Sequence, residues 1–215
     1  IAVQGGPTPL TLTAELADGQ AVTKLTERAL AALGGLDILV VNTGHLPYGG
    51  FTAHDDEAWQ QAFDLVVMSA VRVVRGCLPA LRSALPRGSG AIVFIGSAST
   101  REPRLHLLSN AMRAAVAGLA KTLAHELVSD GIRVNTVAPG YVESGRIAAR
   151  LTQMIADGRT RAEAEQAISG GGLPLGRIGR ADEIADVVAL LASPLASYVT
   201  GATLTADGGV GRSIF

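Results

Sequence analysis

The sequence predicts an α/β fold, in which helices cover both faces of a doubly wound, mostly parallel sheet. Short apolar runs alternate with longer segments of helical periodicity, which is the pattern of βα units. Hydrophobic residues make up 48% of the chain and charged residues only 17%, as expected for strands buried on both faces. Because 215 residues suffice for one domain and are few for two, we expect a single domain over residues 1–215.

The first half of the chain predicts three strands and two helices. The run PLTLTAEL indicates a strand over 9–16, and the apolar spacing after it indicates a helix over 18–33. LDILVVN, at 36–42, is a continuous aliphatic run stopped by Asn-Thr-Gly, as in a buried strand. A long helix is expected over 58–85, capped by one of the two aspartates before it. GAIVFIGS indicates a buried strand over 90–97.

The second half continues the alternation. A helix is expected over 108–128, and GIRVNTVAPG indicates the next strand and its exit loop at 131–140. The segment 144–170 is polar and helical, of the kind that forms a mobile lid. A further helix is expected over 180–193, with a cap at Asp182 or another neighbour of Ala181, followed by a last strand at 201–209.

The front of a doubly wound nucleotide-binding sheet is not found. Such a sheet begins with a strand and a glycine-rich turn that holds a pyrophosphate at a helix N-terminus. No such turn follows any strand here, and the opening IAVQGGPTP leads into proline rather than a helix. We therefore expect the first βα units to be absent from this chain. Either the protein is truncated or these units precede residue 1; we favour the second, because a sheet without its central strand exposes unpaired edges.

Charge distribution and hydropathy indicate which partners this protein lacks and in which cell compartment it is expected. The 18 basic and 19 acidic residues are interspersed, so no basic patch for nucleic acid is expected. No apolar run is long enough to span a bilayer and no signal peptide opens the chain, which favours a cytoplasmic protein without a membrane partner. The one cysteine, Cys77, lies in an apolar run and is interpreted as a buried small hydrophobe. No metal site is expected.

Four segments in the right order resemble the short-chain dehydrogenase/reductase family, over residues 12–209. DILVVNTGH is similar to its Asn-Asn-Ala-Gly turn, and AIVFIGSAS to the strand that ends in its catalytic serine. GIRVNTVAPGYVES is similar to the family's Pro-Gly segment beside the nicotinamide, and GRIGRADEIADVVALLASPLASYVTGATLTADGG to its C-terminal signature. The resemblance is greatest to the 3-oxoacyl-carrier-protein reductase-like branch.

The resemblance implies a Rossmann-like fold and an oxidoreductase that uses NAD or NADP on a small-molecule carbonyl/alcohol pair. It implies a homodimer or homotetramer that pairs the two long helices, although their apolar stripes are equally explained by packing inside one subunit. The cofactor-binding residues that it implies are Asn42, Gly44, Arg113, Pro139, Gly140, Val142 and Ser144.

The family's catalytic positions depart from its usual residues. The resemblance places Ser97 at the serine, Ser109 at the tyrosine, Arg113 at the lysine and Val66 at the asparagine. A serine hydroxyl is too weak an acid to replace tyrosine unless a strong base adjoins it. Arginine keeps the positive charge but cannot relay a proton, because it stays protonated. The chain is thus expected to be a divergent member without the Tyr/Lys pair.

Other groups offer replacements for the lost proton donor. His45 follows the Asn-Thr-Gly turn at the carboxyl end of a strand, where doubly wound sheets bind ligands, and is the first candidate. The alternative for His45 is a loop histidine that faces solvent. His106 lies about one helical turn before Ser109, at the mouth of the expected cleft. Tyr141 follows the Pro-Gly pair and is interpreted as a contact in the pocket rather than as a proton donor. Arg113 is open to a second interpretation as an anion site. Two functions remain: a reductase or dehydrogenase with a non-standard donor, or a non-catalytic relative that binds a ligand or a subunit.

Overall fold

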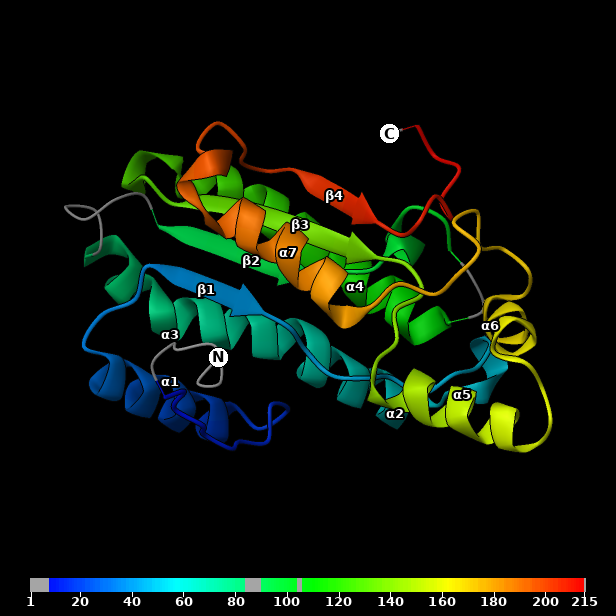
Figure 1. Cartoon of the computed structure of the whole chain (residues 1–215). Helices are drawn as coiled ribbons and strands as arrows, with labels where there is room; N and C mark the ends of the chain where they lie inside the picture. The colour runs from blue at the N-terminus through cyan, green and yellow to red at the C-terminus, as the bar shows by residue number, and fades with distance from the viewer. Residues whose placement is uncertain (1–7, 84–89, 104–105, 215) are drawn as a thin grey trace.

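The computed structural model describes residues 8–83, 90–103 and 106–214, and it confirms the α/β architecture (Figure 1). Four strands form one sheet in the order β1-β2-β3-β4, and every neighbouring pair is parallel. The strands are β1 (Ile38–Val41), β2 (Ala91–Ile95), β3 (Arg133–Pro139) and β4 (Thr203–Ala206). Each lies inside a segment expected to be a strand. Most of the opening IAVQGGPTP lies outside the described residues.

Helices cover both faces of the sheet, as a doubly wound fold requires (Figure 1). The helices α3 (Ser69–Ser83) and α4 (Leu107–Glu126) cover one face, and α7 (Ala181–Ala192) covers the other. Side chains of β2 alternate between the two layers, because successive residues of a strand point to opposite faces. Ile92 and Phe94 pack in the core under α3 and α4, whereas Val93 packs with residues of α7.

Helix α1 lies alongside α3, and two further helices lie beyond one end of the sheet (Figure 1). Helix α1 (Gly19–Leu33) is capped by Asp18, whose carboxylate accepts hydrogen bonds from the amides of Gln20 and Ala21, and it packs on α3. The expected lid is two helices, α5 (Gly145–Ala156) and α6 (Arg161–Ser169). They lie beyond the carboxyl ends of the strands (Figure 1).

The long helix expected over 58–85 is interrupted. Helix α2 (Asp56–Ala62), capped by the side chain of Asp55, passes into a π-helical segment, η3 (Phe63–Met68), and then into α3. Residue Val66 lies in this segment and is fully buried. Such π-turns are rare and occur most often near functional sites. Residues 84–85, the expected end of the helix, lie outside the described residues.

The strand expected over residues 9–16 does not form, and this expectation was wrong. Residues 9–16 all lie in the described part of the chain, and no described strand exchanges backbone hydrogen bonds with them. Apolar alternation alone does not make a strand, because an isolated one leaves its backbone groups unpaired. On β1, the edge strand of the sheet, Ile38 and Val40 are 47% and 44% exposed.

Two further expectations can be compared with the described residues. Cys77 is 6% exposed and lies in the core between α3 and the sheet, which confirms it as a buried small hydrophobe. No helix in the described part of the chain is long and apolar enough to cross a bilayer.

Candidate functional site

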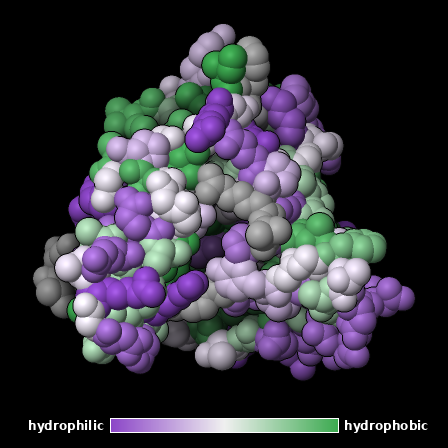
Figure 2. Space-filling view, turned by 90° about the vertical axis from the view of Figure 1, so that its right-hand side faces the viewer, coloured by the Kyte–Doolittle hydropathy of each residue, from purple (hydrophilic) through white to green (hydrophobic). Residues whose placement is uncertain are grey.

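The carboxyl ends of the four strands meet at one edge of the sheet, and a cavity of about 280 Å³ opens there. Figure 2 views this side of the molecule and shows a hollow near its middle, with hydrophilic and hydrophobic side chains around it. Ligands bind at this edge in doubly wound sheets. The lining residues are Tyr48, Ser97, Ala98, Ser99, Glu102, His106, Ser109, Pro139, Gly140, Tyr141, Val142, Ser144, Ile147, Val210 and Gly211.

Ser97 reaches the cavity because β2 ends two residues before it. It is the N-cap of a short 3₁₀ turn, η5 (Ala98–Thr100), and its Oγ accepts a hydrogen bond from the Ser99 amide at 3.2 Å. Its Oγ also shares a hydrogen bond of 2.8 Å with the Ser99 hydroxyl. Two linked hydroxyls therefore lie in the cavity wall, where they can donate to a ligand oxygen.

Ser109 and Arg113 lie one turn apart on α4, but only Ser109 lines the cavity. The Arg113 guanidinium instead donates to backbone carbonyls at the ends of two strands. Its Nη1 bonds Ile95 O at 3.1 Å, and its Nη2 bonds Gly44 O at 3.2 Å and Thr43 O at 3.4 Å. Burial lowers the pKa of this guanidinium, which nevertheless keeps its charge. Arg113 thus holds the ends of β1 and β2 together.

The segment after β3 forms the wall opposite Ser97. A Cβ at Gly140 would lie 2.6 Å from the Cβ of Asp207, so only glycine allows the ends of β3 and β4 to approach this closely. Val142 then pairs with Gly179 in an isolated parallel bridge. Ser144 precedes α5, and its side chain makes no capping hydrogen bond to that helix. Its hydroxyl is therefore available to a ligand.

Besides Arg113, two more of the residues expected to bind a cofactor do not line this cavity. Asn42 and Gly44 follow β1 and do not line it, although the Gly44 carbonyl accepts the bond from Arg113. The Val66 side chain is fully buried in the core beneath α4, so it faces no water or ligand. In the described residues, no group of His, Cys, Asp and Glu side chains is suited to a metal ion.

The structure brings His106, and not His45, into the cavity wall. The ring of His106 meets the ring of Tyr48 edge to face, with centroids 4.1 Å apart. The ring of His45 also contacts that of Tyr48, with centroids 5.7 Å apart, but His45 does not line the cavity. Residue 106 also pairs with Gly49 in an isolated parallel bridge. The loop after β1 therefore folds back over the start of α4 and adds Tyr48 to the wall.

Sequence reasoning missed Tyr48, Glu102 and the C-terminal segment as parts of the wall. The Glu102 carboxylate accepts hydrogen bonds from the backbone amides of Arg212 and Ser213. The Asp207 carboxylate accepts another from Gly211 at 2.7 Å. The contacts of Glu102 join residues 110 and 111 positions apart, so no local sequence pattern predicts them. The available signal was only that each segment follows a strand at its carboxyl end.

A nicotinamide cofactor is the ligand that the resemblance implies, and part of the site fits it. Ser97, the Pro139–Gly140 pair and Ser144 all line the cavity, and their hydrogen-bonding groups suit the nicotinamide end. In the described part of the chain, no strand leads through a glycine-rich turn into a helix. The residues for the pyrophosphate are accordingly not identified here.

A parallel doubly wound sheet with a cavity at its carboxyl edge is typical of nucleotide-binding α/β proteins. Comparison with known proteins is consistent with this class. The family model described as Enoyl-(Acyl carrier protein) reductase matches residues 1–211. The cis-4-hydroxycyclohexanecarboxylate dehydrogenase of Sinomonas cyclohexanicum is 35% identical over 197 residues, covering 91% of this chain and 74% of that protein.

Two further relatives are similar over comparable lengths. The 3-oxoacyl-[acyl-carrier-protein] reductase of Escherichia coli (strain K12) is 32% identical over 194 residues, covering 90% of this chain and 74% of that protein. An NADPH-bound short chain oxidoreductase of Pseudomonas aeruginosa PAO1, described as containing an atypical catalytic center, has a TM-score of 0.82 and 33% identity, covering 93% of this chain and 75% of that one. The chain belongs to the short-chain dehydrogenase/reductase family of NAD(P)-dependent oxidoreductases.

Proposed function

We propose that this protein is an NAD(P)-dependent oxidoreductase that interconverts a carbonyl and an alcohol, with His106 as its proton donor and acceptor. The observation that carries the proposal is that one cavity gathers Ser97, His106 and the Pro139–Gly140 pair at the carboxyl edge of the sheet. The bound cofactor supplies or accepts the hydride. The Ser97 hydroxyl, linked to Ser99, holds the substrate oxygen, and His106 delivers the proton to it.

The neighbouring side chains are less suited to the proton transfer. Ser109 lies in the wall, but a serine hydroxyl needs an adjoining base to act as an acid near neutral pH. Arg113 directs its donors to three backbone carbonyls and stays charged, so it neither relays a proton nor acts as a base. Histidine changes its charge between pH 5 and 8, which is the range in which a general acid is most effective.

The relatives support this reaction class. Their descriptions name a dehydrogenase of a hydroxy acid and a reductase of an oxoacyl group, which are the two directions of one carbonyl/alcohol exchange. The structural relative with an atypical catalytic center was found with NADPH bound, so a departure from the family's usual centre does not prevent cofactor binding there.

The first experiment titrates NADH and NADPH against the protein and follows the fluorescence of the reduced nicotinamide. We expect one or both cofactors to bind. If neither binds, the proposed oxidoreductase function is refuted. Carbonyl compounds are then screened for oxidation of the cofactor. In His106→Gln we expect the reduction rate to fall by about 10²–10⁴. The rate of the unaltered protein should also decline as pH rises above the ordinary histidine range, because the acid must be protonated.

A matched control separates the role of His106 from general damage to α4. His125 lies on the same helix, is exposed and does not line the cavity, so His125→Gln should retain the rate and its pH profile. Equal rates in the two variants would mean that another group supplies the proton.

A second candidate function is a non-catalytic protein that keeps the fold and a ligand cavity. The observation in its favour is that Arg113 is committed to strand carbonyls while Val66 is buried, which leaves no proton path of the family's usual kind. Cofactor binding without oxidation of any carbonyl compound by the unaltered protein would favour this candidate.

A further inference from the structure

A second cavity, of about 260 Å³, adjoins the first beneath the lid helices. Tyr48, His106, Tyr141 and Ile147 line both cavities, and they form the wall between them. The residues that line only the second are Arg150 and Ile168. Its surface is therefore largely aromatic and aliphatic, with one permanent positive charge.

The spacing along α5 directs Arg150 into this second cavity. Ser144, just before the helix, lines the first cavity, Ile147 lines both, and Arg150 lines the second. Residues three apart lie on the same face of a helix, so these three side chains form one row. Six residues of helix rise by about 9 Å, so the backbone of Arg150 lies about that far along the helix axis from that of Ser144.

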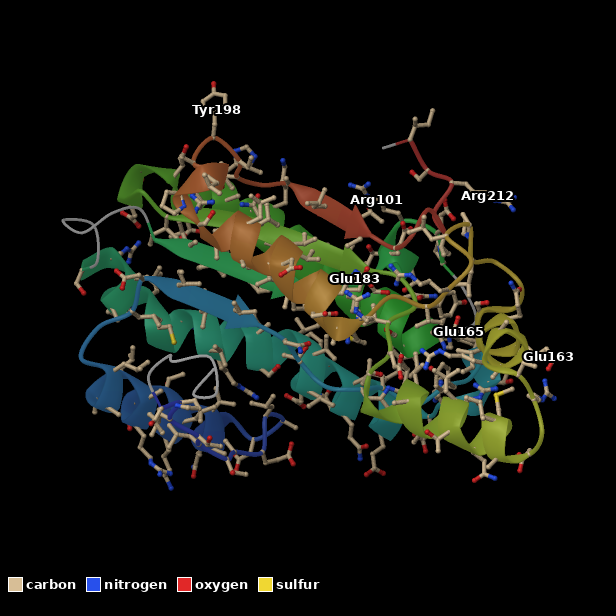
Figure 3. The ribbon with its side chains drawn as sticks, in the orientation of Figure 1. Arg101, Glu163, Glu165, Glu183, Tyr198 and Arg212 are labelled. Atoms are coloured by element: carbon tan, nitrogen blue, oxygen red, sulfur yellow. The ribbon has the colours of Figure 1, made fainter. Side chains whose placement is uncertain are left out.

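No carboxylate of the described residues forms an ion pair with Arg150, whereas two arginines near it in the fold are paired. Arg161 joins Glu143 at 2.6 Å and Glu165 at 2.8 Å, and Arg177 joins Glu183 at 2.6 Å. Figure 3 shows Glu165 on the side of α6 that faces the body of the molecule, and Glu163 on its outer side. Arg161 and Arg177 are therefore neutralised within the protein, whereas the guanidinium of Arg150, beside the second cavity, has no ion pair with a described carboxylate.

The charges give the two cavities opposite characters. Glu102 contributes a carboxylate to the wall of the first cavity and is not part of the second. The carboxylate of Glu102 repels an anionic ligand group from the first cavity, and Arg150 attracts it to the second. The planar guanidinium of an arginine binds a carboxylate through two parallel hydrogen bonds. A ligand with one charged end is thereby oriented with its neutral end at Ser97.

We infer that the substrate is a carbonyl compound with an apolar ring body and a carboxylate, and that Arg150 binds the carboxylate. This inference rests on the proposed function for its carbonyl end only. The ring body lies between Tyr48, Tyr141 and Ile147, and the carboxylate lies in the second cavity. Arg150 is then a specificity-determining residue, and the removal of its charge weakens anionic ligands while neutral ones of the same shape are unaffected.

The test uses benzoate and benzamide, which share a shape and differ in charge, and it measures binding by calorimetry at neutral pH, with and without NADPH. We expect the protein to bind benzoate at least about tenfold more tightly than benzamide, and Arg150→Met to abolish that preference while it still binds benzamide. Arg159→Met is the matched control, because Arg159 is exposed on the lid and lines neither cavity. Circular dichroism checks that both variants keep the fold.

The outcomes distinguish this inference from the proposed function. A preference for benzoate that survives in Arg150→Met overturns the inference, as does equal affinity for the two compounds or no binding of benzoate. If the preference depends on Arg150 but neither nicotinamide cofactor binds, the carboxylate site stands and the proposed oxidoreductase fails. If a cofactor binds but benzoate is not preferred over benzamide, the carboxylate site fails and the proposed oxidoreductase stands.

Discussion

Replacing Arg133 should lower the free energy of unfolding more than replacing any other charged side chain described here. Arg133 begins β3, is only 7% exposed, and its guanidinium donates four hydrogen bonds to backbone carbonyls. Nη1 reaches Leu191 O at 2.7 Å and Ala196 O at 3.1 Å, and Nη2 reaches Ala192 O and Ser193 O, both at 3.1 Å. These carbonyls end α7 and continue into the turn after it, where a helix leaves such groups without partners.

The expected loss in Arg133→Met follows from these four bonds. Methionine fills similar volume but donates nothing, so four carbonyls lose their partner. At about 1 kcal/mol net for each bond, the free energy of unfolding should fall by about 4 kcal/mol. The charge also stabilises the negative end of α7, which adds to the loss rather than reducing it. Burial lowers the pKa of the guanidinium, yet an arginine remains charged at neutral pH, so the effect is present there.

Equilibrium unfolding in urea, followed by circular dichroism, measures the loss. Arg133→Lys should recover only part of it, because a single ammonium cannot reach all four carbonyls. Arg75→Met is the control: Arg75 is exposed on α3, and its loss should change the free energy of unfolding by less than about 0.5 kcal/mol. A loss below about 1 kcal/mol in Arg133→Met would refute the account, since it would mean that water replaces the guanidinium at the helix end.

Two further predictions concern pH and close packing. The bidentate bond from Arg177 lowers the pKa of the Glu183 carboxyl to about 2. Its contribution to stability is therefore complete above the ordinary glutamate pKa of about 4.3 and is lost as pH falls toward 2. In Arg177→Met an NMR titration should find this pKa raised, although the backbone amide of Arg180 still lowers it below its ordinary value. An unchanged pKa would contradict the role of Arg177. Gly140→Ala should lower the free energy of unfolding by about 2 kcal/mol, because the added methyl group would lie 2.6 Å from Asp207 Cβ. Gly118→Ala, inside α4 with nothing within 4 Å, should instead stabilise by up to about 1 kcal/mol, and similar effects of the two changes would show that space at Gly140 is not limiting.

Several features of the fold were predictable because their causes are local. The four strands are continuous aliphatic runs between turn residues, and such runs are buried wherever the sheet places them. Helix α1 begins at its aspartate cap and α4 follows its apolar period. The segment 144–170 was predicted to be helical, which α5 and α6 confirm, although the break between the two helices was not predicted. The segment 9–16 shows the limit of this reasoning, because a strand also requires a partner that local pattern does not supply.

The candidate site was predicted in outline, since parallel strands bring their carboxyl ends to one edge. Ser97, Ser109, Pro139, Gly140, Val142 and Ser144 all line the cavity there. The choice between the histidines was not predictable. His106 reaches the wall because the loop after β1 folds back over the start of α4, and the same fold leaves His45 beyond Tyr48.

The sequence by itself determined which segments are buried and in what order they alternate, because hydrophobic period and turn residues act over a few neighbours. Only the tertiary structure decided what the charged groups do. Arg113 has the spacing of a cofactor ligand, yet its guanidinium bonds Gly44, 69 positions earlier in the chain. Arg150 is an ordinary lid arginine by sequence and lies in a cavity wall in space. A long side chain takes whichever partners folding brings within its reach, and those partners are rarely its neighbours in sequence.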